Sequence, residues 1–361
     1  MPLASIQKII SLSPIKDADR IETAKVLGWD CIVRKGEFKE GDLCIYIEID
    51  SLIPREDWSE FLFKNEKDKY RLRTMKMKGQ LSQGLVLPLQ IDPISCEDWD
   101  INLQTGIAKA GNTGSYIKTF NIGDDVTNNL GITKYEKQIP IALAGQIKGD
   151  FPSFIPKTDE VRIQSELKLL EDLKGKPYYI TTKLDGTSAT YYKLNGEFEV
   201  CSRNLRIKNP EQATYHDKSE EGVKSENVYW KMAKKYKIEE WLPDGYAIQG
   251  EICGPGIQKN PLKLSDQELF IFNVFNIKEG KYYFPSDDVY IDDATVNVGL
   301  KLVPLATDFG SEFNYSLEEL LEKAKGKYPN GGNKEGIVVR SMDQLISFKV
   351  VNNDYLLKDE E

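Results

Sequence analysis

Histidine is almost absent from this chain of 361 residues, which contains only His216. A Ser-His-Asp or Cys-His catalytic centre would have to use this single residue, and a metal site built from several histidines is excluded. His216 lies in a loop-like stretch between charged neighbours, where a surface histidine is expected. If the protein is an enzyme, its chemistry depends on lysine, arginine and carboxylates, the groups that suit phosphate and Mg²⁺.

Cysteine is also scarce and follows no recognisable spacing. The sequence contains five cysteines, with no CxxC pair among them: Cys31, Cys44, Cys96, Cys201 and Cys253. An odd, scattered set argues against a disulfide framework or a zinc site and fits reduced thiols. We therefore expect a reducing compartment, the cytoplasm, with the nucleus as an open alternative.

Long apolar runs are absent as well. No stretch approaches the length of a membrane span, and residues 1–15 lack the basic and then apolar layout of a signal peptide. We therefore expect no membrane partner. The net charge of −9 argues against a simple polyanion binder, so that any nucleic acid would be bound by local basic patches.

The chain contains regions of different pattern. In residues 1–130, aliphatic residues at every second position from 43 to 49 predict a half-buried strand, and short apolar runs separated by glycines predict a small all-β barrel. Residues 131–157 carry several glycines and prolines without a sustained period and are predicted to be a linker. Residues 158–361 mix strand and helix patterns and are predicted to form a second domain.

Seven strands are expected in this second domain, over residues 178–183, 189–194, 197–203, 246–253, 268–277, 336–341 and 345–351. Asn195-Gly196 predicts a hairpin between two of them. Helices are expected over residues 223–242 and from Ser316, which fits a capping box with Glu319.

The most informative motif is Lys183-Leu184-Asp185-Gly186, where a predicted strand ends in a turn. A lysine in this position can attack a nucleotide α-phosphate and hold it as a phosphoramide. The motif alone is a weak signal, because a hairpin turn with a solvated lysine has the same pattern.

Further charged residues follow in order, each within or next to a predicted strand: Arg203, Glu251, Glu335 and Lys349. Carboxylates such as Asp185 offer oxygen ligands for Mg²⁺, while the cations can bind an α-phosphate. Phe272 or Phe275 offers a face for stacking adenine. Taken singly, the charged residues would more often be surface groups and the phenylalanines core residues, so only their joint order favours a nucleotide site.

The order and spacing of these motifs resemble the covalent nucleotidyltransferases, the superfamily of DNA ligases, RNA ligases and mRNA capping enzymes. Within it the chain looks like the RNA ligase family 5 type, because the barrel-like region comes first and only twelve residues follow Lys349. The resemblance includes residues 151–164, 250–260 and 348–356. It also includes Thr187-Ser188, because DNA ligases and capping enzymes usually have an arginine in this part of the motif. One departure is Ser347, since many relatives have Lys-x-Lys at the final motif.

This resemblance implies an α+β fold, in which an N-terminal all-β OB-like barrel precedes a nucleotidyltransferase domain of antiparallel sheets with flanking helices. It implies an ATP-dependent RNA ligase, with ATP and Mg²⁺ or Mn²⁺ as cofactors. Lys183 would take AMP from ATP, AMP would pass to a 5′-phosphate, and a 3′-OH would displace AMP and seal the nick. Family members favour RNA at the 3′-OH end of a nicked duplex, which implies a role in RNA repair and RNA as the partner.

The resemblance also implies roles for individual residues. The expected catalytic set is Lys183, Asp185, Arg203, Glu251, Glu335 and Lys349. The nucleotide is expected to contact Thr182, Lys183, Gly186, Arg203, Glu251, Phe272, Val338 and Lys349. The metal ion is expected to be held by Asp185, Glu251 and Glu335.

Residues 64–78 are rich in lysine and arginine. Four of these cations alternate, so that a strand would place them on one face as a phosphate-binding edge: Lys67, Lys69, Arg71 and Arg73. A solvated edge strand protected by lysines is an equally good interpretation. Arg162 is a further expected nucleic-acid contact, and the basic helix within 223–242 is a weaker second candidate.

Two rival functions stay open. One is an mRNA capping-type guanylyltransferase, which would accept GTP. The other is a non-catalytic RNA-binding protein, in which the OB-like module binds RNA and the second domain is degenerate. The preferred metal, the RNA or DNA preference of each strand, the oligomeric state and any protein partners are left open.

Overall fold

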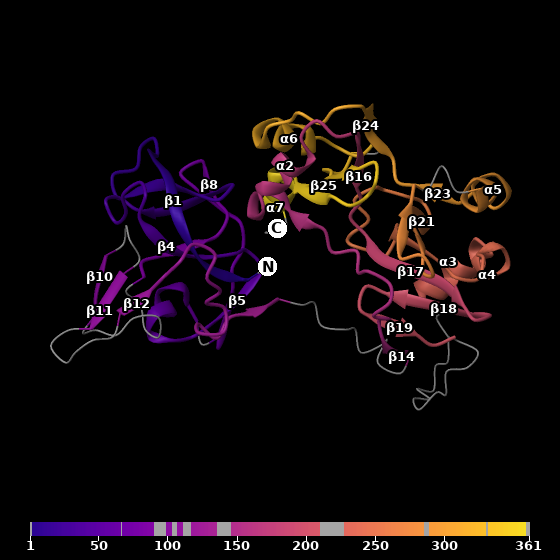
Figure 1. The fold of residues 1–361 in the computed structure, drawn as a ribbon, viewed down its shortest axis with the longest axis horizontal. Coiled ribbons are helices and arrows are strands. Elements are labelled where there is room, and N and C mark those ends of the chain that lie inside the picture. The colour runs from indigo at the N-terminus through magenta and orange to yellow at the C-terminus, as the bar shows by residue number, and fades with distance from the viewer. Residues whose placement is uncertain are drawn as a thin grey trace. The chain divides into compact units, whose positions relative to one another are not determined.

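The structure is a computed structural model, and it describes residues 2–65, 67–89, 99–102, 107–110, 117–135, 146–209, 227–284, 289–329 and 331–358. The chain divides into two compact units (Figure 1). The first comprises Met1–Lys137 and Gln164–Leu167, and the second comprises Gln138–Ile163 and Lys168–Asp359.

The first unit is a nearly closed all-β barrel of the OB type. Its five-stranded sheet has the order β3-β2-β1-β4-β9, and smaller sheets join β13-β5-β6, β10-β11-β12 and β7-β8. The elements are β1 (Ala4–Pro14), β2 (Ile21–Val26), β3 (Trp29–Arg34), β4 (Leu43–Ile47), β5 (Ser51–Pro54), a 3₁₀ helix η1 (Asp57–Leu62), β6 (Lys69–Arg71), β7 (Met75–Met77), β8 (Gln80–Ser82), β9 (Leu85–Leu87), β10 (Trp99–Asn102), β11 (Ile107–Ala110), β12 (Ile117–Thr119) and β13 (Thr133–Lys134).

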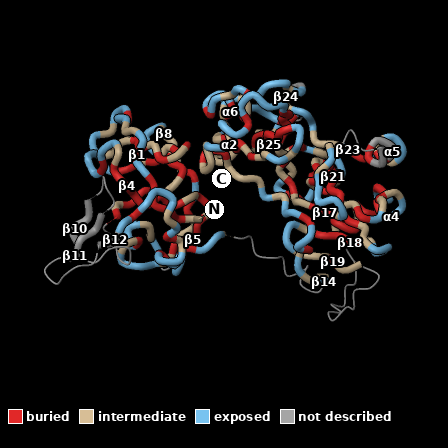
Figure 2. Tube along the Cα trace, viewed as in Figure 1, coloured by how far each residue is buried: buried red, intermediate tan, exposed pale blue. Residues whose placement is uncertain are grey.

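The strand β4 is more deeply buried than its sequence pattern predicts. All five of its residues are buried, although alternation predicted that one face would be exposed (Figure 2). Ile45 packs in a cluster with Ile6 and Ile53, while Tyr46 on the other face packs with Trp29. The prediction of a half-buried strand was wrong because apolar clusters cover both faces of β4.

The second unit contains two sheets and six α-helices among its described residues, and the 3₁₀ helix η2 begins at its Ile163 and continues into Gln164 and Ser165 of the first unit. The eight-stranded sheet has the order β14-β19-β18-β17-β20-β21-β22 with β23 beside β21, and the five-stranded sheet has the order β15-β26-β25-β16-β24. The elements are β14 (Ile147–Asp150), β15 (Val161–Arg162), η2 (Ile163–Ser165), α2 (Lys168–Leu173), β16 (Tyr178–Lys183), β17 (Thr187–Leu194), β18 (Glu197–Ser202), β19 (Leu205–Ile207), α3 (Val228–Lys235), α4 (Ile238–Trp241), β20 (Tyr246–Cys253), β21 (Glu268–Asn276), β22 (Lys281–Tyr283), α5 (Val289–Asn297), β23 (Lys301–Leu302), β24 (Leu305–Gly310), α6 (Leu317–Ala324), β25 (Gly336–Ser341), β26 (Ser347–Val351) and α7 (Asn353–Lys358).

Most strand pairs of the second unit are antiparallel, and the α+β prediction is confirmed. Asn195 and Gly196 form the β17–β18 turn with φ values of 54° and 80°, as a tight hairpin requires. Ser316 caps α6, and it forms with Glu319 the reciprocal bonds of a capping box.

The helix expected over residues 223–242 is shorter and broken. Within the described part of that range, α3 ends at Lys235 and α4 begins at Ile238, because Lys237 between them has a left-handed φ of 48°. Trp230 of α3 lies in the large core cluster against the eight-stranded sheet. Lys224 lies outside the described residues.

The segment expected to be a linker also contributes to a sheet. Ile147–Asp150 forms β14, which pairs with β19 at the edge of the eight-stranded sheet. No helix among the described residues is long and apolar enough to cross a membrane.

Candidate active site

Lys183 is the last residue of β16 and lies beside the start of β25. The antiparallel register pairs Lys183 with Gly336, which brings Glu335 next to the lysine. Lys183 Nζ is 2.7 Å from Glu335 Oε1, and the two side chains are 25% and 18% exposed. The chain then passes through Asp185-Gly186 into β17, which belongs to the other sheet. The motif is therefore a crossing between sheets with a paired lysine, and the alternative of a hairpin with a solvated lysine was wrong.

Acidic neighbours set the protonation of Lys183. Burial alone would lower the pKa of the ammonium, but Glu335, Glu251 and Asp185 together outweigh burial and raise the pKa above its ordinary value. The carboxylates thus hold Lys183 as an ammonium at neutral pH.

Glu251 is the carboxylate of this group that the eight-stranded sheet contributes. It lies on β20, paired with Ser188 of β17 and Phe270 of β21. Burial, with a smaller contribution from Glu335 and Asp185 and against the opposing charge of Lys183, raises the pKa of Glu251 to about 8. The neighbouring carboxylates thus favour the neutral form of Glu251.

Lys349 lies one strand away from Glu335, on the same sheet. The register of β26 places Lys349 opposite Val338 of β25 and Arg162 of β15. Burial, together with the charges of Lys183 and Arg162, lowers the pKa of Lys349 to about 8. These three cations form a group suited to binding phosphate oxygens.

Arg203 follows β18 and pairs with Asp159, and both side chains are about half exposed. Arg203 is close enough to Glu251 to favour its charged form. Asp159 also counteracts the lowering of the Lys349 pKa. The structure thus places Asp159, which the sequence reasoning missed, between two of the expected phosphate contacts.

Gly186 is required by close packing of the motif on β20. A Cβ at Gly186 would lie 2.3 Å from the carbonyl oxygen of Ile252 and 2.9 Å from Sγ of Cys253. The Gln258 amide donates to the Gly186 carbonyl at 3.2 Å. Any larger residue would push the motif away from Glu251 and its strand.

Tyr328 bonds to the backbone at three positions of the motifs. Its hydroxyl donates to the Lys183 carbonyl at 2.8 Å and accepts from the N–H groups of Asp185 and Glu335, each at 3.1 Å. No spacing or residue pattern in the sequence pointed to Tyr328, which lies in a turn between α6 and β25.

The two phenylalanines considered for adenine stacking lie in different surroundings. Phe275 is buried and packs on Tyr282 in a core cluster, with ring centroids 4.9 Å apart. Phe272 is half-buried, and the Arg340 guanidinium lies 5.8 Å from its ring centroid. Phe275 is therefore a core residue, whereas the ring of Phe272 is only partly buried.

Two other expected nucleotide contacts lie on β16 and β25. Thr182 is buried, and its N–H donates to the carbonyl of Pro304 at 2.8 Å. Because it precedes Lys183 on the strand, its side chain points to the opposite face of the sheet. Val338 pairs with both Thr181 and Lys349 and is 7% exposed, on the face that carries Lys349.

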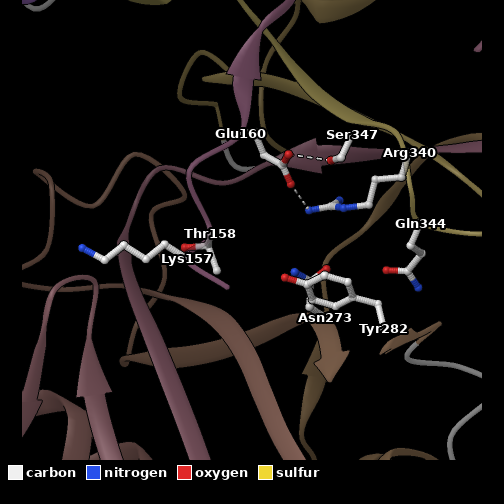
Figure 3. Close-up of a pocket in the computed structure, with 8 residues that line it drawn as sticks. All are labelled: Lys157, Thr158, Glu160, Asn273, Tyr282, Arg340, Gln344 and Ser347. Atoms are coloured by element: carbon white, nitrogen blue, oxygen red, sulfur yellow. Dashed lines mark hydrogen bonds and ion pairs between the residues drawn. The ribbon is translucent and has the colours of Figure 1, made fainter. Parts of the chain in front are cut away.

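A small pocket of about 90 Å³ lies farther along the same sheet face, two residues before Lys349 on β26 (Figure 3). Glu160 accepts from Arg340 at 2.9 Å and from the hydroxyl of Ser347. Asn273 faces this pocket from the other sheet, and its buried Oδ1 has no hydrogen-bond partner among the described residues. Ser347, the departure from the Lys-x-Lys pattern, thus belongs to a partly buried polar network.

Within the described residues, no three histidine, cysteine or acidic side chains already surround a point where a metal ion would sit. The donor chemistry of Asp185, Glu251 and Glu335 nevertheless fits a hard divalent cation. Carboxylates are the ligands that Mg²⁺ and Mn²⁺ accept, often together with substrate phosphates and water. Glu335 and Asp185 add to the rise that burial causes in the pKa of Glu251, and such an ion would offset the charge of these neighbours.

The basic residues of the first unit do not form one continuous strand face. β6 covers only Lys69–Arg71, so Lys67 and Arg73 lie outside it, although both are exposed. Arg71 is 2.7 Å from Asp50 and lies over the Tyr135 ring, which indicates a structural role. Of the four cations predicted to alternate, Lys67, Lys69 and Arg73 are exposed. Arg162, predicted with them, belongs instead to the second unit beside Lys349.

The cysteines of the described chain are free and buried: Cys31, Cys44, Cys201 and Cys253. His216 and Cys96 lie outside the described residues.

Comparisons with known proteins find a matching family model for each of the two units. A family model described as an OB-fold domain matches residues 3–89, and a model described as RNA ligase matches residues 176–352. A search of curated proteins finds no significant match.

Solved structures of Naegleria gruberi RNA ligase resemble the whole chain. The structure with PPi is 34% identical, covers 100% of this chain and 99% of that one, and has a TM-score of 0.81. A lysine-to-alanine variant with ATP and Mn is 33% identical, covers 99% of each chain and has a TM-score of 0.80. A glutamate-to-alanine variant with AMP and Mn is 33% identical over 100% and 99% of the chains, with a TM-score of 0.81.

Proposed function

The chain belongs to the RNA ligase family, and we propose that Lys183 is the residue that becomes adenylylated in an ATP-dependent sealing reaction. The observation that carries the proposal is the Lys183–Glu335 pair of 2.7 Å, flanked by Glu251 and Asp185. This arrangement places an amine among carboxylates beside the cations Lys349 and Arg162, where a triphosphate would be bound.

The proposed reaction has three steps. The Lys183 amine attacks the α-phosphorus of ATP, so that an N–P bond forms and pyrophosphate leaves. AMP then passes to an RNA or DNA 5′-phosphate, and the lysine is regenerated. Finally a 3′-OH attacks the activated phosphate, a phosphodiester forms, and AMP leaves.

The residues around Lys183 have separate proposed tasks. Lys183 must lose a proton before it attacks, and the Glu335 carboxylate at 2.7 Å is placed to accept it. Lys349 and Arg203 bind the phosphates of ATP, and the adenine ring lies between Phe272 and Val338. A divalent cation held by Asp185, Glu251 and Glu335 would offset their charge and thereby lower the pKa of the amine.

Residue spacing in the relative supports this assignment. In the Naegleria gruberi enzyme, variants were solved at a lysine and an aspartate two positions apart and at a glutamate and a lysine fourteen positions apart. Lys183 and Asp185 have the first spacing, and Glu335 and Lys349 have the second. Structures of that enzyme with ATP, AMP and PPi are consistent with adenylyl transfer.

The substrate that we propose is a nicked duplex with RNA at the 3′-OH end, which corresponds to RNA repair. The support is the family resemblance and the exposed cations of the OB-like unit, proposed as contacts to the phosphate backbone. Residues 1–130 would then serve as the nucleic-acid module, 131–157 as the connection and 158–361 as the adenylyltransferase, in the cytoplasm.

Two measurements test this proposal. Incubation with radiolabelled ATP or GTP separates a ligase from a guanylyltransferase, because the covalent label follows the accepted base. Sealing of nicked duplexes with RNA or DNA at the 3′-OH side tests the substrate. Equal sealing of both nicks would contradict the RNA preference, and a GTP label would favour the capping alternative.

A further inference from the structure

We propose that Tyr328 is a positioning residue for adenylyl transfer, because its hydroxyl fixes the backbone at Lys183, Asp185 and Glu335 in one geometry. The inference rests on the proposed role of Lys183. Tyr328 acts through the backbone of these residues and is assigned no contact with the reacting atoms.

We call the three hydrogen bonds of the Tyr328 hydroxyl the clamp, and together they use all the hydrogen-bonding capacity of a phenol. The hydroxyl proton is donated to the Lys183 carbonyl at 2.8 Å, and the oxygen accepts the N–H groups of Asp185 and Glu335 at 3.1 Å each. A tyrosine hydroxyl has one proton and two acceptor sites, so all three are occupied. One atom thus joins the end of β16 to the residue that precedes β25.

The phenol itself is held firmly. Tyr328 is 3% exposed and packs in a cluster with Leu184, Cys253 and Phe270. Its N–H donates to the Gly332 carbonyl at 2.7 Å, which closes the turn that carries it. Burial raises the pKa of the phenol far above its ordinary value, so the hydroxyl keeps its proton throughout the working pH range.

The Tyr328 hydroxyl lies where the backbone pairing of β16 and β25 ends, so the pairing alone does not fix the residues beyond it. The β16–β25 pairing ends at Lys183 and Gly336. Beyond that pair the two chains diverge into Leu184-Asp185 and into the turn before Glu335. Tyr328 bonds to both chains just at this end, and so it maintains the 2.7 Å ion pair between Lys183 and Glu335.

The test compares Tyr328→Phe with Tyr191→Phe. Tyr191 is an equally buried tyrosine of the same unit, whose hydroxyl donates to a single backbone carbonyl, that of Tyr229, at 3.0 Å. We expect Tyr328→Phe to slow formation of the AMP adduct by about 10- to 100-fold. The KM for ATP should change by less than about twofold, because the hydroxyl acts on the geometry of attack and not on nucleotide binding.

A second readout needs neither ATP nor activity. The pH dependence of Lys183 modification by a small amine-reactive reagent, followed by mass spectrometry of its peptide, reports the pKa of the amine. When the clamp is removed, Glu335 is held less closely and raises this pKa less, so Lys183 in Tyr328→Phe should react at lower pH than in the wild type. Tyr191→Phe should leave both the rate and the modification profile unchanged.

Two outcomes would overturn the clamp. One is a Tyr328→Phe variant with the wild-type adduct rate and modification profile. The other is an equal loss of rate in both variants that follows their loss of thermal stability, which would indicate a purely structural role. If the wild type forms no adduct with ATP, the proposed function fails, but the modification profile still decides whether Tyr328 sets the environment of Lys183.

Discussion

Arg162 of β15 and Lys349 of β26 lie at paired positions of adjacent parallel strands. This pairing places two cations close together on the sheet that carries Lys183, and it contributes to the low pKa of Lys349. Like charges gathered in a partly buried place destabilise a protein unless an anion binds there. The relationship therefore favours a phosphate site at Lys349 and leads to the first prediction.

Replacing Lys349 by methionine should stabilise the nucleotide-free protein while it abolishes adduct formation. The pKa of Lys349 is lowered to about 8, below the value of an unfolded lysine, so its charge destabilises the fold below pH 8, and that penalty disappears as the pH rises toward 10.5. At pH 7 we expect a gain of about 1–3 kcal/mol in the free energy of unfolding by urea denaturation. The exposed Lys325 provides a control, since Lys325→Met should change stability by less than about 0.5 kcal/mol. A clear loss of stability in Lys349→Met would contradict this view of the site.

The raised pKa of Glu251 predicts an opposite pH dependence. The folded pKa of about 8 exceeds the unfolded value, so the stability contributed by the neutral acid is present below about pH 4.5 and is lost as the pH rises toward 8. Glu251→Gln should remove this loss, and its melting temperature should vary less between pH 5 and pH 8. Added Mn²⁺ should stabilise the wild type more at pH 8 than at pH 5. At pH 8 it should stabilise the variant less than the wild type. Identical metal effects in both proteins would exclude Glu251 as a ligand.

Gly186→Ala should destabilise the second unit and impair the adduct. The new Cβ would lie 2.3 Å from the Ile252 carbonyl oxygen, which is backbone and cannot move aside cheaply. We expect a loss of about 1–3 kcal/mol in the free energy of unfolding, as for other overpacking substitutions. Gly149→Ala is the matched control, because its Cβ would meet only the flexible end of Arg206, 3.0 Å away, and should be tolerated. Equal stability of the two variants would show that the motif has room that the structure does not indicate.

Charge reversal of the exposed cations in the OB-like unit should separate RNA binding from adenylylation. A variant with Lys67, Lys69 and Arg73 changed to glutamate should seal nicks more weakly and bind RNA with a shallower salt dependence, by about one unit of slope for each lost phosphate contact. The rate of Lys183 adduct formation should be unchanged. Arg71→Ala should mainly reduce stability, because Arg71 pairs with Asp50. Unchanged sealing across a range of salt concentrations would exclude these residues as the RNA contact.

Much of the fold was predictable from local patterns, because strand bounds and helix caps depend on residues that are adjacent in the sequence. The bounds of β16, β20 and β25 coincide with the predicted strands, and the Ser316 cap depends on only four residues. The burial of both faces of β4 was missed, since it depends on strands and clusters distant in the sequence.

In the candidate site, too, some residues could be predicted from the sequence and others could not. Lys183 and Glu335 were singled out by motif order, and the structure brings them together across β16 and β25. Asp159 and Tyr328 were missed because their roles arise only when separate segments meet: Asp159 precedes a parallel strand, and Tyr328 bonds to backbone atoms that carry no residue-specific signal. Arg162 was predicted as a nucleic-acid contact, which stays a prediction, and only strand pairing reveals its place beside Lys349.

Peptide mass spectrometry after incubation with ATP and Mn²⁺ shows directly whether Lys183 carries AMP. We expect the peptide containing Lys183 to gain the mass of one AMP and Lys183→Met, with its fold intact, to gain none. An adduct on another residue, or no adduct on a folded wild-type protein, would exclude Lys183 as the adenylylated residue.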